Sequence, residues 1–343
     1  MINLISDTVT KPSKDMLQYM FNAEVGDDVF GEDPTVNDLE SYCANLFGKE
    51  KAIFCPSGTM TNQIAIKCHT QPLDEMICDH YSHVYQYETG GYAFNSGVAV
   101  NLIVGKNGKI TAPQIEVAIK PVFDWLPISK LVVLENSCNK GGGSYYTKKE
   151  IQPISKLCKE RGLKLHLDGA RLFNVLVETG ESPAEIGVMF DSISICISKG
   201  LGAPVGSLLI GTEEVIRQAR RYRKVMGGGM RQAGYMAAAC KYALTKNVER
   251  LKQDNLKARE LGELLTTLPW VKSVRPVKTN IAIFDLDERL TADSFLNMMK
   301  SHNIIGSAFG PNTVRFVTHL DYTDDMHSKV LEVLSQINPE SYK

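Results

Sequence analysis

Short apolar runs that alternate with amphipathic helical patterns constrain the fold of this chain more than any other feature. Seven runs have the length and the β-branched content of buried strands, and helical patterns lie between most of them. The strand candidates are residues 51–55, 75–78, 98–104, 130–134, 164–167, 192–197 and 205–210. The helical patterns include residues 35–47, 59–68, 148–161 and 213–223. This alternation predicts an α/β fold with a mostly parallel sheet.

The character of the sequence changes near residue 246, after an Ala-rich helical stretch at residues 230–244. Beyond it, short strand patterns alternate with helical ones. The strand patterns cover residues 271–274, 280–284 and 313–317, and the helical patterns cover residues 248–268, 292–301 and 324–334. We expect a large domain over residues 1–246, whose first 34 residues form an irregular arm, and a small α+β domain over residues 247–343.

Composition excludes several classes of protein. The 38 basic and 39 acidic residues give a formal net charge of −1, so no global field favours nucleic acid or an anionic membrane. No apolar run approaches the length of a membrane span, and the first residues lack the pattern of a signal peptide. The eight cysteines form no C-x-x-C pair, and the seven histidines show no metal-ligand spacing. We therefore expect a cytoplasmic protein with buried, reduced thiols and no metal site, which binds neither nucleic acid nor membrane.

A single lysine stands where an apolar run ends. Residues 192–197 are Ile-rich, and Ser198, Lys199 and small flexible residues follow them. Because burial disfavours the ammonium form, a lysine at the end of a buried strand tends to have a nucleophilic amine. Such an amine forms Schiff bases with aldehydes. The alternative is a lysine that extends from the strand end into solvent.

A carboxylate ends an earlier apolar run in the same way. Asp168 follows residues 164–167 and precedes Lys199 by 31 positions (199 − 168), a gap that one strand–helix–strand unit fits. Both side chains would then lie at the carboxyl edge of one sheet, where α/β folds bind ligands. The alternative role for Asp168 is that of a helix N-cap.

Two earlier segments carry further candidates. Ser57, Gly58 and Thr59 lie between a predicted strand and a predicted helix, where free N–H groups and hydroxyls bind phosphate well. An ordinary N-cap turn has the same pattern. His80 and His83 follow a strand, so that one ring is placed to lie flat on a planar cofactor, although loop histidines are common.

Two arginines complete the set. Arg171 directly follows the Asp168 turn, and Arg315 lies in a β-rich run, where an unpaired charge is costly and a guanidinium is well shaped to bind a carboxylate. A strand-end lysine, a strand-end aspartate, a phosphate turn and a ring-stacking histidine together indicate pyridoxal phosphate. The lysine would form the Schiff base, and the aspartate would keep the pyridine nitrogen protonated.

The order of these motifs resembles the low-specificity L-threonine aldolases, pyridoxal-phosphate enzymes of the aspartate-aminotransferase-like superfamily. The resemblance covers nearly the whole chain. It is carried by residues 6–10, 25–35, 57–60, 166–171, 198–202, 227–232 and 315–320, which read SDTVT, VGDDVFGEDPT, SGTM, HLDGAR, SKGLG, GGGMRQ and RFVTHL. It implies a large cofactor-binding domain with a seven-stranded, mostly parallel sheet, and a small C-terminal α+β domain.

The resemblance also implies roles for single residues. Lys199 would carry the Schiff base, Asp168 would pair with the pyridine nitrogen, and His83 would stack on the ring. The residues expected to contact the cofactor are Ser57, Gly58, Thr59, His83, Asp168, Arg171, Lys199 and Arg231. Arg231 would do so from a neighbouring subunit, because the family forms homotetramers built from dimers with active sites at the dimer interface. Ser6, Arg171 and Arg315 would hold the substrate carboxylate.

The implied reaction is the aldol cleavage of L-threonine, L-allo-threonine and other β-hydroxy-α-amino acids. The enzyme would be a carbon–carbon lyase that takes part in glycine biosynthesis and threonine catabolism. Threonine would give acetaldehyde and a glycine carbanion delocalised into the ring as a quinonoid. Lys199, Asp168 and His83 would be catalytic, and His83 or a water that it orients would be the base. The alternative is another pyridoxal-phosphate reaction, such as β-elimination or racemisation, because the cofactor site alone does not choose the bond.

One departure from the family concerns Trp125. Many bacterial members have a second active-site histidine shortly before the strand that ends in Leu-Glu-Asn, and Trp125 occupies that neighbourhood here. We expect Trp125 to narrow the pocket on the side-chain side of the substrate.

Overall fold

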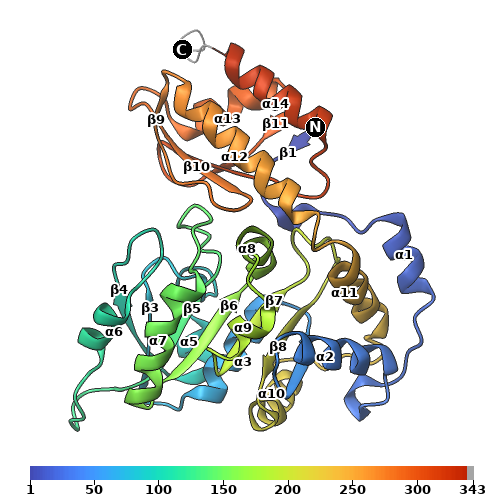
Figure 1. Ribbon diagram of the computed structural model, residues 1–343, viewed down its shortest axis with the longest axis vertical. Coiled ribbons are helices and arrows are strands. Elements are labelled where there is room, and N and C mark those ends of the chain that lie inside the picture. Colours follow the sequence, from blue (N-terminus) through green and yellow to red (C-terminus); the bar gives the residue numbers. More distant parts are fainter. Residues whose placement is uncertain (338–343) are drawn as a thin grey trace.

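The computed structural model describes residues 1–337, which form a large sheet-bearing body and a smaller C-terminal unit above it (Figure 1). The large body contains one sheet of seven strands in the order β2-β8-β7-β6-β5-β3-β4. The strands are β2 (Lys51–Cys55), β3 (Asp74–Asp79), β4 (Ala99–Ile103), β5 (Ile128–Glu135), β6 (Lys164–Gly169), β7 (Ser192–Cys196) and β8 (Ser207–Gly211). Only β8 runs antiparallel to its neighbours. The predicted seven-stranded, mostly parallel sheet is confirmed.

Helices cover both faces of this sheet. Since successive strand residues point to opposite faces, Ile53 packs with one helical layer and Phe54 with the other. The first layer contains α3 (Gly58–His69), α5 (Gly91–Ser96) and α10 (Glu213–Val225). The second contains α2 (Pro34–Leu46), α6 (Ala112–Ala118), α7 (Lys148–Arg161), α8 (Leu172–Thr179) and α11 (Gly234–Lys246). In the described part of the chain, no helix is long and apolar enough to cross a membrane.

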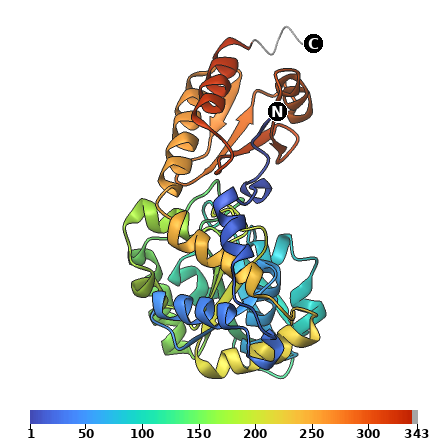
Figure 2. The same ribbon diagram turned by 90° about the vertical axis from the view of Figure 1, so that its right-hand side faces the viewer.

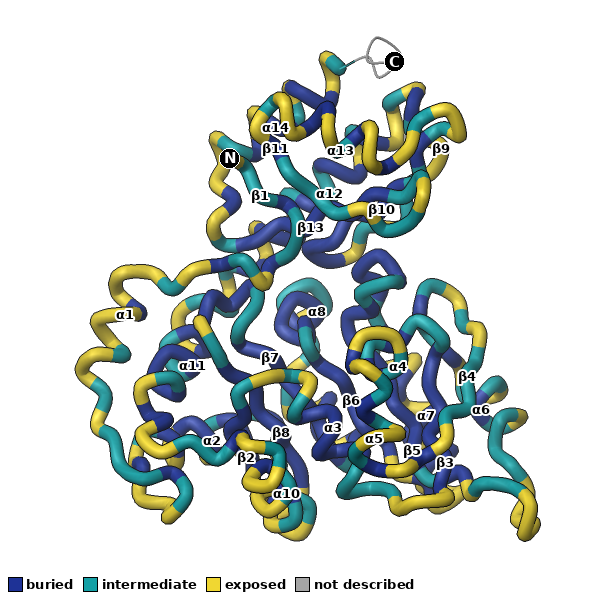
Figure 3. Tube along the Cα trace, turned by 180° about the vertical axis from the view of Figure 1, so that it is seen from behind, coloured by how far each residue is buried: buried dark blue, intermediate teal, exposed yellow. Residues whose placement is uncertain are grey.

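The N-terminal arm is more ordered than the sequence predicts. It contains helix α1 (Lys14–Phe21), so the expectation that the first 34 residues are irregular is wrong there. Only Met16 of α1 is buried, and Figure 3 shows most of the helix in the colour of exposed residues. Periodicity is read over windows of about 11–18 residues, and a helix of 8 residues is shorter than that. The arm begins with β1 (Ile2–Asn3), which pairs in parallel with β11 (Ile304–Ile305).

The C-terminal unit is built around a four-stranded antiparallel sheet in the order β12-β13-β10-β9. Its elements are α12 (Leu251–Thr267), β9 (Val271–Val274), β10 (Ile281–Leu286), α13 (Ala292–Ser301), β12 (Ser307–Ala308), β13 (Thr313–Val317) and α14 (Asp324–Gln336). Phe284, Phe295 and Phe316 form its aromatic centre. The domain boundary at residue 246 stays a prediction. It falls where α11 ends, but β1 reaches the C-terminal unit, as Figure 2 shows from the side.

We predict that Phe295→Ala lowers the free energy of unfolding by about 3–5 kcal/mol, because a buried aromatic side chain is lost and a cavity remains. Phe295 is fully buried, whereas Phe94 is 91% exposed. Phe94→Ala is therefore the control, with an expected change within about 0.5 kcal/mol. Urea denaturation followed by circular dichroism measures both changes, and equal losses would contradict the packing.

Candidate active site

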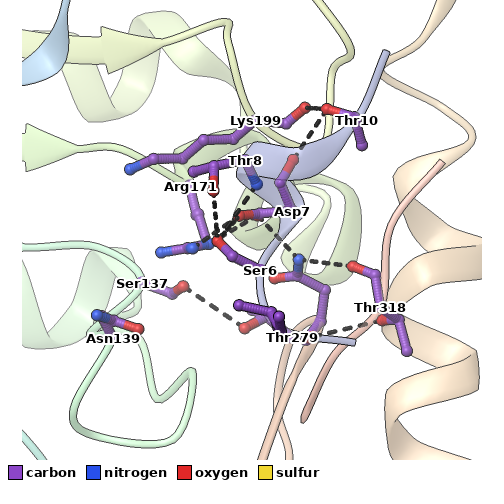
Figure 4. Close-up of polar contacts among 12 residues, drawn as sticks. Ser6, Asp7, Thr8, Thr10, Ser137, Asn139, Arg171, Lys199, Thr279 and Thr318 are labelled. Atoms are coloured by element: carbon purple, nitrogen blue, oxygen red, sulfur yellow. Dashed lines mark hydrogen bonds and ion pairs between the residues drawn. The ribbon is translucent and has the colours of Figure 1, made fainter. Parts of the chain in front are cut away.

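Three predicted functional side chains come together at the carboxyl edge of the large sheet. Asp168 lies near the end of β6, and Lys199 follows β7 by three residues. The backbone oxygen of Lys199 accepts hydrogen bonds from Thr10 Oγ1 at 2.7 Å and from Gly202 N at 2.8 Å. Figure 4 shows the Lys199 side chain extending away from its bond to Thr10. The N-terminal arm thus holds the turn that carries the lysine.

His83 begins the short helix α4 (His83–Gln86) and lies beside Asp168. Its Nδ1 is 3.0 Å from Glu88 Oε1, and ligand-type atoms of His83, Glu88 and Asp168 all lie within 4.8 Å of one another. Burial alone would lower the pKa of His83, but the hydrogen bond to Glu88 and the negative charges of Asp168 and Glu135 raise it above its ordinary value. The structure therefore places His83 beside Asp168, together with Glu88, an acid that the sequence analysis missed.

Asp168 is 2% exposed and has donors on both carboxylate oxygens. Asn62 Nδ2 donates to Oδ2 at 2.9 Å, and the backbone N–H of Ala170 donates to Oδ1 at 3.1 Å. The second bond is a local turn contact, and Asp168 is not a helix N-cap, because Arg171 occupies that position before α8. The first bond comes from helix α3, so Asp168 also belongs to a network that reaches across the sheet.

Glu135 is a further buried acid at this edge, directly opposite Asp168 in the register of the neighbouring strands β5 and β6. Its oxygens accept from the backbone N–H of His83 and of Asn139, each at 2.9 Å. Burial and the negative charge of Asp168 raise the pKa of Glu135 to about 7. The sequence contained a signal for Glu135, because it directly follows the predicted strand 130–134 just as Asp168 follows its own. Glu88 and Asn62 had no comparable signal.

The predicted phosphate turn lies beside the lysine-bearing strand. Ser57 caps α3 by accepting from Met60 N at 3.2 Å, as the N-cap interpretation requires. The first N–H groups of a helix have no acceptor within the helix, so those of Gly58 and Thr59 are available to an anion. A Cβ on Gly58 would lie 2.5 Å from Cys196 Sγ, which means that α3 begins directly against the end of β7. Close packing of this kind requires glycine and brings the turn next to the Lys199 segment.

Arg171 does not point a free guanidinium at the site. It donates to Asp7 from Nε at 2.8 Å and from Nη2 at 2.7 Å, as Figure 4 shows. Burial alone would raise the pKa of Asp7, but the Arg171 charge and hydrogen bonds hold that pKa well below its usual range. Asp7 stays ionised and fixes the arm to the sheet. Its neighbour Ser6 accepts from Thr8 N at 3.2 Å within a short turn.

Arg315 is the buried cation that lacks an acidic partner. Among the described residues no carboxylate pairs with it; Nη1 donates to Asn139 Oδ1 at 2.7 Å and Nη2 to the oxygen of Ile5 at 2.9 Å. Its Nε is buried without a hydrogen-bond partner, and its guanidinium carbon lies 4.6 Å from the ring centre of Phe309. Burial and the nearby Arg171 charge lower the pKa of Arg315 to about 10. A buried guanidinium of this kind is stabilised by a carboxylate ligand.

Arg231 lies apart from these residues within one chain. Its side chain is 55% exposed, pairs with Asp27 at 2.8 Å and lies 5.7 Å from the ring centre of Phe30. Both partners belong to the predicted motif at residues 25–35. Arg231 and Phe30 are exposed and Asp27 is partly exposed, and among the described residues no contact joins these three to Lys199.

The expectation for Trp125 is wrong for the pocket of its own chain. Trp125 precedes β5 and is 76% exposed, with its ring stacked on Phe123 at 4.8 Å. The site lies at the far, carboxyl end of the same strand, where Glu135 stands. Trp125 lies before the start of β5 and Glu135 lies at its end, so the whole length of the strand separates Trp125 from the site.

Comparison with known proteins places this fold and site in a class. The family model described as "Beta-eliminating lyase" matches residues 3–289. A low specificity L-threonine aldolase of Escherichia coli K12 is 41% identical over 331 residues, which cover 96% of this chain and 97% of that protein. A low-specificity L-threonine aldolase of Arabidopsis thaliana is 37% identical over 334 residues, 95% of this chain and 93% of that protein.

The fold is shared with solved structures as well. The threonine aldolase of Leishmania major superposes with a TM-score of 0.86 at 23% identity, covering 98% of this chain and 99% of that one. This chain belongs to the beta-eliminating lyase family and, within it, to the low-specificity L-threonine aldolases. The resemblance found in the sequence motifs is confirmed.

We predict that Glu135→Gln removes part of the pH dependence of stability. Glu135 binds a proton more tightly in the folded state than at its ordinary pKa of 4.5, so the unfolding free energy of the unaltered protein falls as pH rises from about 4.5 to about 7. The expected contribution is about 3 kcal/mol. Unfolding of protein stripped of bound small molecules, measured between pH 5 and 8, should show a flatter profile for Glu135→Gln than for Glu150→Gln, whose pKa is lowered rather than raised. Parallel profiles would contradict the assignment.

Proposed function

We propose that this protein cleaves L-threonine and L-allo-threonine to glycine and acetaldehyde with pyridoxal phosphate as its cofactor. The observation that carries the proposal is the arrangement at one sheet edge: Asp168 lies near the end of β6, Lys199 follows the neighbouring strand β7, and His83 lies beside Asp168. Arg315, which has no acidic partner among the described residues, bonds to Asn139 and to the N-terminal arm. Family membership supports the same reaction class, a carbon–carbon lyase.

The side chains at the site fit the cofactor. Lys199 would bind its aldehyde carbon, Asp168 its pyridine nitrogen, and the α3 turn of Ser57, Gly58 and Thr59 its phosphate. The donor set matches each group, since an anionic acid faces a protonated ring nitrogen and free N–H groups face a dianion. The packing of Gly58 against Cys196 supports this fit, because any side chain there would displace the turn. When bound, pyridoxal phosphate supplies an electron sink for the pair released from the substrate's Cα.

Arg315 would bind the substrate carboxylate and so fix which bond to Cα is cleaved. Its free Nε provides one donor, and a carboxylate would replace the Asn139 contact by a charge-assisted one. Arg171 uses Nε and Nη2 on Asp7, which leaves Nη1 for the same ligand. Ser6 is adjacent to Asp7 and completes the carboxylate set that the motifs predict.

His83 is our candidate for the base. Glu88 accepts from Nδ1, which fixes the tautomer that leaves Nε2 without a hydrogen. Nε2 could then take the proton of the substrate's β-hydroxyl group, directly or through a water, while the Cα–Cβ bond breaks. Because Glu88 and Asp168 favour the protonated ring, the proton would be held at Nε2 until the aldehyde leaves.

We predict that Lys199→Ala abolishes both covalent cofactor attachment and acetaldehyde formation. Loss of the only amine at this strand end removes the Schiff base, which no neighbouring residue replaces. The assay incubates the protein with pyridoxal phosphate and L-threonine or L-allo-threonine, and it measures the acetaldehyde and glycine formed. The unaltered protein should form the two products in equal amounts. Lys252→Ala, an exposed lysine on α12, is the matched control and should keep the unaltered rate. Pyruvate and ammonia, or a D-amino acid, from the unaltered protein would instead indicate β-elimination or racemisation.

We infer further that the protein is a homotetramer built from dimers, in which Arg231 completes the phosphate site of a neighbouring subunit. The surface position of Arg231, beside Asp27 and Phe30, supports this inference. Asp27 is the only acid that pairs with Arg231 among the described residues, so the guanidinium can also bind the cofactor phosphate of a neighbouring subunit. A cytoplasmic location and a role in glycine formation and threonine breakdown belong to the same proposal.

Subunit mixing tests the shared site. Lys199→Ala and Arg231→Ala protomers should each be inactive alone, or nearly so. Co-refolded one to one, they should recover about a quarter of the unaltered activity, because random pairing leaves that share of sites intact at a two-fold interface. Recovery that stays at the sum of the two separate activities would show that each chain uses its own Arg231 or none.

A further inference from the structure

A chain of four polar side chains lies behind the cofactor-facing acid, between α3 and the sheet. Asn62 and His69 belong to α3, His166 to β6 and Ser192 to β7. Asn62 is 2% exposed, and His166 and Ser192 are fully buried. Buried polar groups cost free energy unless they are hydrogen-bonded, so a connected set of them requires an explanation. None of these four residues is used by the mechanism above.

The direction of the hydrogen bonds is fixed at Asn62. Its Nδ2 lies 2.8 Å from Glu88 Oε1 and 2.9 Å from Asp168 Oδ2. The amide nitrogen carries two hydrogens and donates one to each carboxylate oxygen, so it faces both acids. The amide oxygen of Asn62 then faces His166 Nε2 at 3.2 Å.

This orientation fixes the tautomer of His166. The Asn62 oxygen can only accept, so Nε2 of His166 must carry the hydrogen. Burial lowers the pKa of His166 to about 3, so the ring is neutral and its Nδ1 has no hydrogen. Ser192 Oγ, 2.8 Å from Nδ1, must therefore donate to it. His69 Nε2, 2.8 Å from the same oxygen, donates in turn, and burial lowers the pKa of His69 to about 4.

Every hydrogen in the chain thus points toward the two acids of the site. We propose that His166 is a positioning residue for the cofactor: it locks the Asn62 amide so that both its hydrogens stay on Asp168 and Glu88. The inference rests on the proposed function, because Asp168 is the proposed partner of the pyridine nitrogen and Glu88 orients His83. One amide would then control both the acid below the ring nitrogen and the histidine that stacks on the ring. A residue without a donor at position 166 would leave the Asn62 oxygen buried without a partner, and the amide would lose the bond that holds it against the two acids.

A neighbouring hydrogen bond provides a matched control. Thr61 Oγ1 and Ser194 Oγ are 2.6 Å apart and buried, and they join the same helix α3 to the same strand β7. Neither residue contacts Asn62 or His166 in the bonds described. Ser194→Ala therefore removes an equally buried hydroxyl contact between α3 and β7 without touching the chain. A merely structural role for His166 or Ser192 would make their variants behave like Ser194→Ala.

The test uses the full chain with His166→Phe, Ser192→Ala and Ser194→Ala. The readouts are the dissociation constant of pyridoxal phosphate, the absorption spectrum of the bound cofactor and the thermal midpoint. We expect His166→Phe to weaken cofactor binding about ten-fold or more and Ser192→Ala about three-fold in the same direction, with altered spectra. Ser194→Ala should lower the midpoint but leave binding and spectrum unchanged. Ser192→Ala, the smaller change, decides the matter should His166→Phe not fold.

Histidine nitrogen NMR of the unaltered protein gives an independent readout. The expected spectrum has His166 protonated at Nε2 alone, and protonation at Nδ1 alone would overturn the proposal. Unchanged affinity for pyridoxal phosphate in folded His166→Phe and Ser192→Ala would also overturn the proposal. So would a loss of affinity in Ser194→Ala equal to that in those two variants. Failure of the unaltered protein to bind pyridoxal phosphate would instead overturn the proposed function, and the tautomer would still decide whether the hydrogen-bond chain exists.

Discussion

The buried ion pair between Asp7 and Arg171 is the interaction on which the arrangement of the site depends. Its side chains are 0% and 6% exposed, and removing one partner of such a pair typically costs about 3–5 kcal/mol because the other charge is left buried alone. Asn280 of the C-terminal unit also donates to Asp7, at 3.1 Å. Three distant parts of the chain thus meet at one carboxylate. Two residues before it, the oxygen of Ile5 holds Arg315, so the same anchor places the buried guanidinium.

The opposite side of the site carries an excess of negative charge. Glu88, Glu135 and Asp168 are all buried within a short stretch of the sheet edge, and burial together with the negative charge of Asp168 raises the pKa of Glu135. Like charges at close range disfavour ionisation, so a cationic ring placed among them would relieve the repulsion. The site thus combines an unpaired cation on one side with crowded acids on the other. A substrate carboxylate at Arg315 and a positively charged ring nitrogen at the acids would complement both, and ligands that do so stabilise the folded state.

The sequence predicted those parts of the molecule that burial dictates. All seven strands of the large sheet were found within two residues of their ends, because strands buried on both faces are apolar runs that stand out from their surroundings. Helix α1 was missed because its 8 residues are fewer than the window over which helical periodicity is read. Lys199 and Asp168 were found because each follows a recognisable strand, and Glu135 met the same criterion without being chosen.

Pairings between distant residues could not be predicted in this way. Arg171 and Asp7 are 164 positions apart, and nothing in the local pattern of either shows that they meet. Trp125 was misplaced for a related reason, since alignment with a family motif gives the neighbours of a residue in sequence but not the end of the strand at which it stands. The polar residues of β6 and β7 were visible as an alternation within fully buried strands, His166 with Asp168 and Ser192 with Ser194, but only the position of α3 shows what they bond to.

The pairing of β1 with β11 also sets an order of events during synthesis. Residues 2–3 leave the ribosome about 300 residues before their strand partner at residues 304–305. The seven-stranded sheet can form while the arm is still unattached, and contacts of such long sequence separation are slow to close. Arg171 is synthesised before Ile304, so Asp7 can form its ion pair before Ile2 can pair with its strand partner. The arm would therefore dock first at Asp7 and last at β1. Binding competence would therefore be the last property that a nascent chain acquires, after its main core is already folded.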